Sequence, residues 1–254
     1  MSIINTTFGF IFVHVPKSAG TSVTSVLSRL CTLLDVEVGG SAFGESIQSA
    51  YRKRHGISKH STALELRTRL GEQLWLKYVS FGVVRHPLGR LASAYRFLRQ
   101  WDSPDNRWRT RMLEFPAFRD FVASDVWLED EGPDRMFRPQ AFWLADQSSN
   151  RLLVDRVMYV ESLHADLCKV LLESGVPRSK LPDEVPHLNS TRKQDVAYAL
   201  SEELMAKVGE RYRRDLEIFG YEMPAATRDA AAAEVVAGIM NRNTSPAKLP
   251  LPRS

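Results

Sequence analysis

The hydrophobic positions of this chain gather in three short runs, separated by longer stretches of mixed character. The runs are FIFVHV at 10–15, KYVSFGVV at 77–84 and RVMYV at 156–160, and they are rich in β-branched and aromatic residues. Continuous apolar runs of this length are typical of buried strands. Because helical stretches follow them, we predict an α/β fold.

The stretches after the runs carry the signals of helices. The predicted helices cover residues 23–34, 88–100, 163–174 and 201–219. Thr62 and Glu65 have the spacing of a capping box, so a further helix is predicted from residue 62 to about Gly71. The stretch at 52–55, Arg-Lys-Arg-His, is predicted to be a solvated basic turn.

The last thirty residues differ in composition from the rest. An alanine-rich stretch at 225–240 is followed by the polar, proline-containing end NRNTSPAKLPLPRS. Such an end cannot bury enough apolar surface to order itself. We therefore predict one α/β domain at 1–222 and a separate segment with a disordered tail at 223–254.

The turn after the first run has the features of an anion-binding site. Pro16 ends the strand, because proline cannot donate to a sheet, and small residues lead into the helix predicted at 23–34. At a helix start, free N–H groups and the helix dipole favour an anion, and small residues let it approach the backbone. The predicted ligand is a phosphate or a group of similar shape. The candidate residues are Lys17, Ser18, Ala19, Gly20, Thr21 and Ser22.

This turn differs from the loop of nucleoside-triphosphate-binding proteins. Their pattern, G-x-x-x-x-G-K-[ST], places the lysine after the last glycine and a Ser or Thr on magnesium. Here Lys17 precedes Gly20, and the turn is shorter. A P-loop nucleotide kinase or other phosphotransferase is therefore an alternative, and a preference for ATP with magnesium would favour it.

A second set of anion-binding residues follows the second run. Arg85 ends that strand, and Arg90 and Ser93 lie three apart on one face of the next predicted helix. A guanidinium group can bind two oxygens of one anion, and a serine one turn into the helix adds a hydroxyl donor. We therefore predict that Arg85 and Ser93 bind a second oxyanion.

Together, HVPKSAGTS at 14–22 and VVRHPLGRLASAYRFLR at 83–99 resemble the paired signatures of the sulfotransferases that use 3′-phosphoadenosine 5′-phosphosulfate (PAPS). The resemblance is to the branch of carbohydrate sulfotransferases and their bacterial relatives, and it extends more loosely over residues 8–221. It implies a three-layer, P-loop-like fold with a central, mainly parallel sheet flanked by helices.

The same resemblance implies roles for these residues. The first set would hold the 5′-phosphosulfate of PAPS, with Lys17 at the leaving phosphate, and Arg85 and Ser93 would hold the 3′-phosphate. A late polar loop would add donors to the cofactor site. These donors are Ser190, Thr191 and Arg192. The implied reaction moves a sulfuryl group, without a metal, to a hydroxyl of a glycan or another small molecule.

Transfer to a hydroxyl needs a base, and a histidine that is neutral near pH 7 suits this task. In related enzymes a His or Glu from the stretch between the two motifs has this role. His60 is the first candidate, because it lies just before the helix start predicted at Thr62, and Glu45 is the second.

Composition narrows the function class further. With 44% hydrophobic and 25% charged residues the chain has the composition of a soluble globular protein, and its net charge of +4 suits anionic ligands without indicating nucleic acid. Cys31 and Cys168 lie in apolar stretches and are predicted to be buried thiols of a reducing compartment.

No signal peptide and no apolar run long enough to span a bilayer is visible in the sequence, which favours a cytoplasmic protein without a membrane anchor. The basic clusters at 52–54 and 107–111 leave a third alternative, a non-enzymatic module that binds polyanions.

Overall fold

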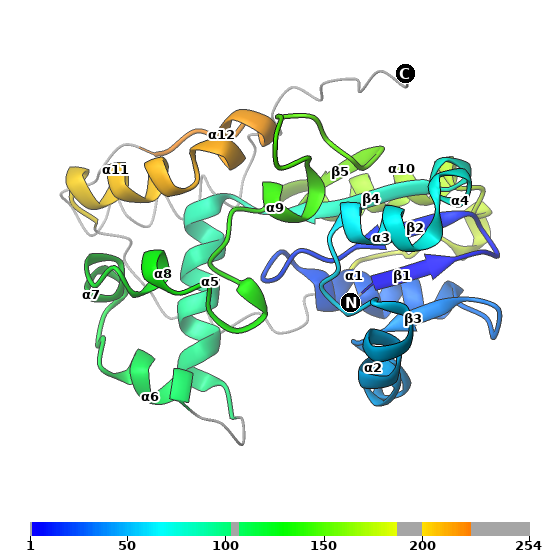
Figure 1. Ribbon diagram of the computed structural model, residues 1–254. Coiled ribbons are helices and arrows are strands. Elements are labelled where there is room, and N and C mark those ends of the chain that lie inside the picture. The colour runs from blue at the N-terminus through cyan, green and yellow to red at the C-terminus, as the bar shows by residue number, and fades with distance from the viewer. Residues whose placement is uncertain (1, 103–106, 187–199, 225–254) are drawn as a thin grey trace. The chain divides into compact units, whose positions relative to one another are not determined.

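The fold was described from a computed structural model, in which residues 2–102, 107–186 and 200–224 are placed (Figure 1). The chain divides into two compact units. The first contains the described residues 2–84 and 140–186, and the second contains 85–102, 107–139 and 200–224. Each unit is described by itself.

A five-stranded sheet forms the centre of the first unit. Its strands, in spatial order, are β3 (Val36–Val38), β1 (Ser2–Asn5), β2 (Phe10–Val13), β4 (Val79–Val84) and β5 (Arg156–Tyr159). β2, β4 and β5 are parallel, and β1 pairs antiparallel with both β2 and β3. The predicted α/β fold with a mainly parallel sheet is confirmed.

All three predicted strands are present, whereas β1 and β3 were not predicted. In β1 only Ile3 and Ile4 are apolar, between the polar Ser2 and Asn5, and in the three-residue β3 the central residue is Glu37, so neither segment forms a continuous apolar run. Their position is decided by pairing, since Ile3 lies opposite Phe12 of β2 and Ser2 lies opposite Val38 of β3. Runs this short carry no usable periodicity of their own.

Helices cover both faces of this sheet (Figure 1). On one face, α1 (Gly20–Leu27) and α10 (Leu163–Glu173) pack on alternate strand residues such as Phe10, Phe12 and Phe81. The other face carries α3 (Ala63–Leu70), α4 (Glu72–Lys77) and α9 (Ala141–Leu144). The arrangement has three layers, as the predicted fold class requires.

The remaining elements of the first unit are short, apart from one helix. They are α2 (Ala42–His55) and the 3-10 turns η1 (Ser28–Leu30), η3 (Val160–Ser162) and η4 (Arg178–Lys180). The helix predicted over 23–34 was too long, because α1 ends at Leu27 and the chain is extended at Cys31. Leu33 and Leu34, which the pattern placed on a helix, are exposed instead.

Two local predictions can be compared directly with the structure. The capping box is confirmed: Thr62 accepts from the N–H of Glu65, and the Glu65 carboxylate accepts from the N–H of Thr62. The prediction of a basic turn at 52–55 is wrong, because these residues form the last turn of helix α2. Cationic side chains are favourable there, since the carbonyl end of a helix carries partial negative charge.

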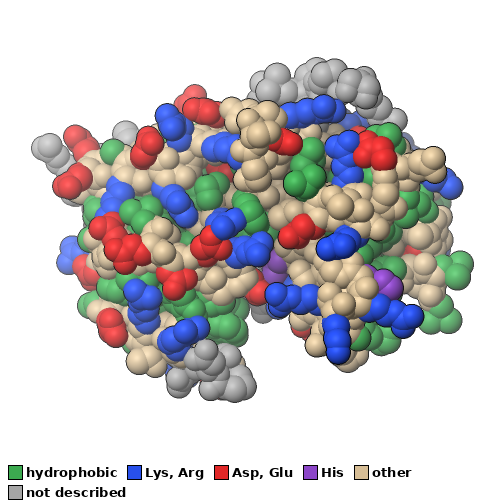
Figure 2. Space-filling model, viewed as in Figure 1, with side chains coloured by type: hydrophobic (Ala, Val, Ile, Leu, Met, Phe, Trp, Pro, Cys, Tyr) green, Lys and Arg blue, Asp and Glu red, His purple; other side chains and the backbone are tan. Residues whose placement is uncertain are grey.

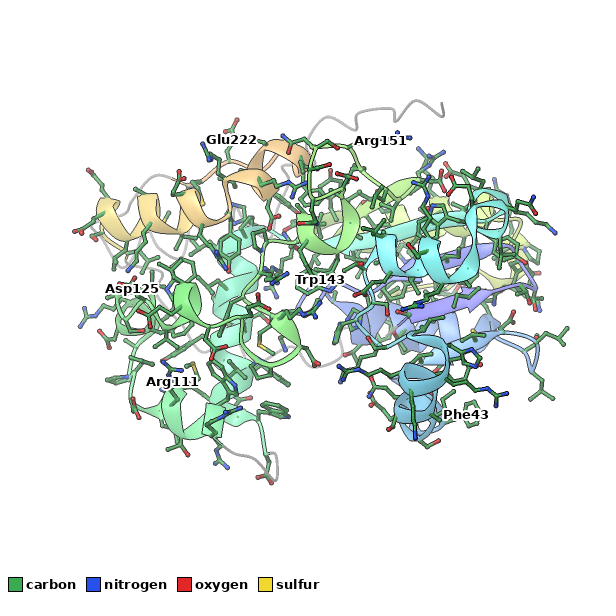
Figure 3. The ribbon with its side chains drawn as sticks, viewed as in Figure 1. Phe43, Arg111, Asp125, Trp143, Arg151 and Glu222 are labelled. Carbon is green, nitrogen blue, oxygen red and sulfur yellow. The ribbon has the colours of Figure 1, made fainter. Side chains whose placement is uncertain are left out.

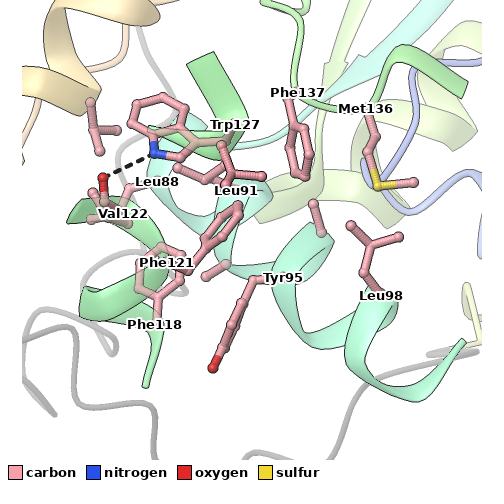
Figure 4. Packing of buried hydrophobic residues seen from close by; sticks show 14 of the residues in the cluster. Leu88, Leu91, Tyr95, Leu98, Phe118, Phe121, Val122, Trp127, Met136 and Phe137 are labelled. Atoms are coloured by element: carbon pink, nitrogen blue, oxygen red, sulfur yellow. Dashed lines mark hydrogen bonds between the residues drawn. The ribbon is translucent and has the colours of Figure 1, made fainter. Parts of the chain in front are cut away.

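The second unit is helical and is built around α5 (Pro87–Gln100). Its other elements are α6 (Arg107–Leu113), α7 (Phe118–Ala123), α8 (Val126–Glu129), η2 (Pro133–Arg135), α11 (Glu202–Arg211) and α12 (Arg213–Phe219). Leu88, Leu91, Tyr95 and Leu98 form one face of α5 and pack against the aromatic residues of α7 and α8 (Figure 4). The buried Trp127 donates from its indole nitrogen to the carbonyl of Val122 at 3.0 Å.

The helix predicted over 201–219 is divided at Tyr212, where φ is −106° and ψ is 17°. The Tyr212 side chain is fully buried, donates to the carbonyl of Phe137 at 3.0 Å and stacks on Trp127 at 5.9 Å. These contacts stabilise the break, because a buried hydroxyl needs an acceptor.

Both cysteines are free thiols and partly exposed, rather than fully buried as predicted. Burial still raises the pKa of Cys31 to about 11. Among the described residues, no helix is both long and apolar enough to cross a bilayer. The predicted segment at 223–254 lies outside the described residues from residue 225 onward.

Candidate functional site

The turn between β2 and α1 has an unusual backbone. Lys17 and Ala19 adopt left-handed conformations, with φ of 66° and 55°, and Ala19 is the N-cap of α1. A left-handed conformation costs a non-glycine residue about 1–2 kcal/mol. Left-handed residues alternating with others turn successive N–H groups toward one side, which makes an anion-binding concavity. The turn therefore has a backbone conformation of the kind that such concavities require.

Ser18 is held from inside the first unit. Its hydroxyl donates to the side-chain oxygen of Gln140 at 2.9 Å, and both residues are buried. Gln140 immediately precedes α9, so a residue far along the chain fixes the middle of the turn. With its hydroxyl used in this way, Ser18 can offer an anion its backbone N–H.

Thr21 and Ser22 lie in the first turn of α1. Thr21 is exposed, whereas Ser22 is buried. An exposed hydroxyl next to the turn is available to a ligand, and the N–H groups of a first helical turn lack partners within the helix.

Gly20 is required by a neighbouring side chain. A Cβ at this position would overlap the imidazole ring of His14, which comes directly after β2. The sequence suggested that a small residue here lets an oxyanion approach. The structure adds a second reason, which is that His14 packs against the start of α1. No sequence pattern could show this contact, because the turn itself creates it.

His60, the first candidate for the base, lies beside His14. The two ring centroids are 4.6 Å apart, and Nδ1 of His60 is 3.2 Å from the backbone carbonyl oxygen of His14. Trp143 of α9, which is labelled in Figure 3, donates from its indole nitrogen to the carbonyl of His60 at 3.2 Å. Because a carbonyl oxygen can only accept, Nδ1 carries the proton of the neutral ring and Nε2 is its basic nitrogen.

His14 is kept neutral by its surroundings. Burial lowers its pKa well below 6.5, and nearby positive charge, including that of Lys59 and Lys17, lowers it further; a proton on His60 would act in the same direction. A charged ring is disfavoured both in a poorly hydrated position and next to other cations. The uncharged His14 can therefore pack closely against His60 and the start of α1.

Glu45, the second candidate, makes other contacts. It lies in the first turn of α2, where its carboxylate accepts from the N–H of Gly40 at 3.0 Å and from the amide of Gln48 at 3.2 Å. Its remaining partner is Lys59, at 4.0 Å. These contacts stabilise the start of α2 and do not reach the turn at 16–22. His60 is thus connected to the turn through His14, whereas the contacts of Glu45 are with Gly40, Gln48 and Lys59.

In the second unit, Arg85 and Ser93 lie along one side of α5. Arg85 is the first residue after β4, and its Nε lies 3.4 Å from the point where a Cβ of Gly89 would be. Ser93 follows Gly89 by four residues and so lies one turn further along the same face. Both side chains are partly exposed. Arg85 thus lies against the face of α5 that also carries Ser93.

Arg90, which the sequence placed beside Ser93, is instead part of the core. It is 1% exposed and donates to the carbonyls of Met136, at 2.9 Å, and Arg138. Its guanidinium also lies 5.6 Å from the ring centre of Tyr212. Buried against these three partners, Arg90 stabilises the second unit.

His86, the N-cap of α5, is also structural. Its Nε2 lies 2.9 Å from the carbonyl oxygen of Glu222, and its ring meets that of Tyr221 edge-on at 5.4 Å. The three predicted residues of the late loop, Ser190, Thr191 and Arg192, lie outside the described residues.

Comparison with known proteins identifies the family. The family model described as "Sulfotransferase family" matches residues 1–222. The chain belongs to the sulfotransferase family. The matched region includes both motifs, at 14–22 and 83–99, and it confirms the resemblance to the sulfotransferases at the level of the family.

The other comparisons do not narrow the function within the family. An uncharacterized protein of Archaeoglobus fulgidus is 29% identical over 113 residues, which is 44% of this chain and 80% of that protein. No solved structure matches this sulfotransferase.

The left-handed turn predicts the effect of a glycine. In Ala19→Gly we expect the free energy of unfolding to rise by about 0.5–1 kcal/mol, because relief of the left-handed strain exceeds the added entropy of the unfolded chain. Chemical denaturation measures this. Ala50→Gly, at an exposed position inside α2, is the control and should lose about 1 kcal/mol. Equal losses in both variants would contradict the strained turn.

The lowered pKa of His14 predicts a pH dependence. In the unfolded chain this pKa returns to about 6.5, so between the two values the unfolded state binds more protons. The contribution of His14 to stability is therefore complete above about pH 6.5 and declines as the pH falls, by at most about 1.4 kcal/mol per unit.

Denaturation curves measured from about pH 7.5 down to about pH 5 test this dependence. In His14→Asn the decline should be shallower, and in the control His164→Asn, on α10, it should match the wild type. Parallel curves for wild type and His14→Asn would show that His14 is not buried in its neutral form.

Proposed function

We propose that this protein is a PAPS-dependent sulfotransferase that moves a sulfuryl group to a hydroxyl, on a carbohydrate. The observation that carries the proposal is the left-handed turn with Lys17 ahead of α1, held by Ser18 and Gln140. Membership in the sulfotransferase family supports the reaction class, and the donor and the acceptor are part of the proposal.

In this proposal the turn holds the 5′-phosphosulfate. Backbone N–H groups at 18–22 bind the terminal oxygens, and Lys17 neutralises the charge that develops on the bridging oxygen of the leaving phosphate. Fixed donors aimed at developing charge are the largest contribution to catalysis in many enzymes. This residue set provides them without a metal ion.

The second set selects the donor. β2 and β4 are neighbouring parallel strands, so the chain leaves both at the same edge of the sheet, toward Lys17 and toward Arg85. We propose that Arg85 and Ser93 bind the 3′-phosphate of the same donor. ATP has no phosphate at that position, and a site built in this way would therefore prefer PAPS.

The chemical step is a displacement at sulfur. The acceptor oxygen forms a bond to sulfur as the bond from sulfur to the bridging phosphate oxygen breaks, and adenosine 3′,5′-bisphosphate leaves. The hydroxyl proton passes to Nε2 of His60, whose Nδ1 proton is held by the carbonyl of His14. The contact with His14 thus keeps the ring in the tautomer that a base requires.

Two variants separate binding from chemistry. Arg85→Ala should weaken binding of adenosine 3′,5′-bisphosphate about 10- to 100-fold by calorimetry, because charge-assisted hydrogen bonds are lost. The same variant should bind adenosine 5′-phosphosulfate, which lacks the 3′-phosphate, as the wild type does. Lys17→Ala should instead lower turnover about 100-fold or more with little change in donor affinity.

The outcomes also distinguish the alternatives. Preferential binding of ATP with magnesium would favour a kinase. If Arg85→Ala weakened the binding of adenosine 3′,5′-bisphosphate and of adenosine 5′-phosphosulfate equally, Arg85 would not have the assigned role. Unchanged turnover in Lys17→Ala would likewise contradict the role of Lys17.

The base can be located with an assay of sulfuryl transfer from PAPS to a panel of glycans and other hydroxylated acceptors. His60→Ala should lower turnover by about 100-fold or more, since this is the usual contribution of a general base. Glu45→Ala is the matched control and should stay near the wild type, because Glu45 contacts the start of α2. Full activity in His60→Ala, with loss in Glu45→Ala, would reverse the assignment.

A further inference from the structure

The turn at 31–35 exposes two adjacent leucines. The relative exposure of Leu33 is 105% and that of Leu34 is 80%, the highest values among the large hydrophobic side chains described. Burial of a leucine side chain would stabilise the protein by roughly 1.5–3 kcal/mol, and these two leucines do not contribute that free energy. Two neighbouring leucines at such exposure indicate a surface that meets another apolar phase.

This turn is held in place by Asp35. Its carboxylate accepts hydrogen bonds from the backbone N–H groups of Thr6, Thr7 and Thr32, and from the hydroxyls of the same residues. Although burial raises the pKa of Asp35, the hydrogen bonds from Thr32, Thr7 and Thr6 hold it below its usual value. The leucines therefore project from an ordered turn whose polar groups are satisfied.

Helix α2 is almost unburied. Of its fourteen residues only Gly44 is buried, where it meets backbone atoms of Gly39 and Glu37 beside β3. Phe43 is 69% exposed and lies on the side of α2 that faces away from the sheet (Figure 3). Ile47 and Ala50 follow at helical spacing, so an apolar stripe runs along a helix that is polar elsewhere.

The far end of α2 is strongly basic. Arg52, Lys53 and Arg54 are all exposed, and none has an ion-pair partner within the part of the chain that the structure describes. Figure 2 shows Lys and Arg side chains gathered over the region where α2 lies in Figure 1. Arg29 is exposed close to the leucine turn in sequence, and Lys180 lies over the ring of Phe8 at 5.4 Å.

The turn and the helix flank the same strand. β3, which forms one edge of the sheet, begins right after Asp35, and α2 follows it after a short glycine-containing loop. We call the exposed residues Leu33, Leu34, Phe43 and Arg52–Arg54, which precede and follow β3 in the chain, the β3-edge surface. It combines exposed aliphatic and aromatic groups with clustered positive charge.

We propose that the β3-edge surface binds an anionic phospholipid membrane, with the leucine turn and Phe43 entering the boundary between headgroups and acyl chains. Apolar side chains with flanking Lys and Arg bind such boundaries through buried apolar area and attraction to anionic lipids. This binding is peripheral and does not depend on the proposed sulfuryl transfer.

Other partners fit the surface less well. A polysaccharide or nucleic acid would use the cations, but it offers no apolar phase to the leucines. A second copy would cover the leucines, but a two-fold interface places the same surface against itself and would bring like charges together. A membrane accounts for the charges and the leucines together.

Sedimentation with vesicles tests the proposal on the full chain. The probes are vesicles of phosphatidylcholine alone and of phosphatidylcholine with phosphatidylglycerol, at low and high salt. The wild type should bind the anionic vesicles at least about 10-fold more tightly, and salt should weaken this binding. The triple variant R52A/K53A/R54A should bind about 100-fold more weakly, as expected when about 1 kcal/mol is lost for each basic residue.

A second variant tests the contribution of the two exposed leucines to membrane binding. L33S/L34S should weaken binding to anionic vesicles by about 10-fold or more, because two apolar side chains no longer enter the lipid. The matched controls are Leu76→Ser on α4, whose exposure of 67% is close to that of Phe43, and R109A/R119A/R213A in the second unit. Each control should stay within about twofold of the wild type.

Three outcomes would overturn the proposal. The first is no preference for anionic vesicles in the wild type. The second is binding that L33S/L34S leaves unchanged while heparin or DNA competes for the cations, which would indicate a polyanion site. The third is a dimer that L33S/L34S dissociates, in a protein that does not bind vesicles. Thermal melting of each variant establishes that it is folded, and donor binding by calorimetry reports separately on the proposed function.

Discussion

The parallel pairing of β2 with β4 is the constraint on which the candidate site depends. Gly82 of β4 lies opposite Val13 of β2, and a Cβ there would meet Leu144 of α9 and the carbonyl oxygen of Val13. The glycine thus lets helix, strand and strand approach closely. Because the two strands are parallel, their carboxyl ends share one edge of the sheet, which is where α/β folds bind ligands.

The region after β2 is organised by contacts that serve shape and chemistry together. His14 packs against Gly20 and lends its carbonyl to His60, while Gln140 holds Ser18 in the turn. A left-handed backbone at a non-glycine residue persists only when neighbours over-determine it. Here those neighbours include His60 and Gln140, from two distant parts of the chain, which explains how the turn can be maintained without glycine at Lys17 or Ala19.

In the second unit, two arginines close together in the sequence differ in burial. Arg90 donates to two backbone carbonyls and lies against Tyr212, so its charge is used inside the core. Arg85, one turn earlier, stays partly exposed beside Gly89. At the β3 edge of the first unit it is the hydrophobic side chains that are exposed, namely Leu33 and Leu34. The Asp35 carboxylate there accepts hydrogen bonds from the backbone N–H groups of Thr7 and Thr32.

The sequence by itself determined the strands β2, β4 and β5, the helix after Arg85, the capping box at Thr62 and the family resemblance of the motifs at 14–22 and 83–99, because each depends on residues close together in the chain. It could not determine β1, β3, the exposed end of the helix predicted over 23–34, or the burial of Arg90. Those depend on partners far away in sequence, such as Val38 for Ser2 and Met136 for Arg90. Tertiary structure also chose between His60 and Glu45 as neighbours of the turn, since only packing on His14 distinguishes them.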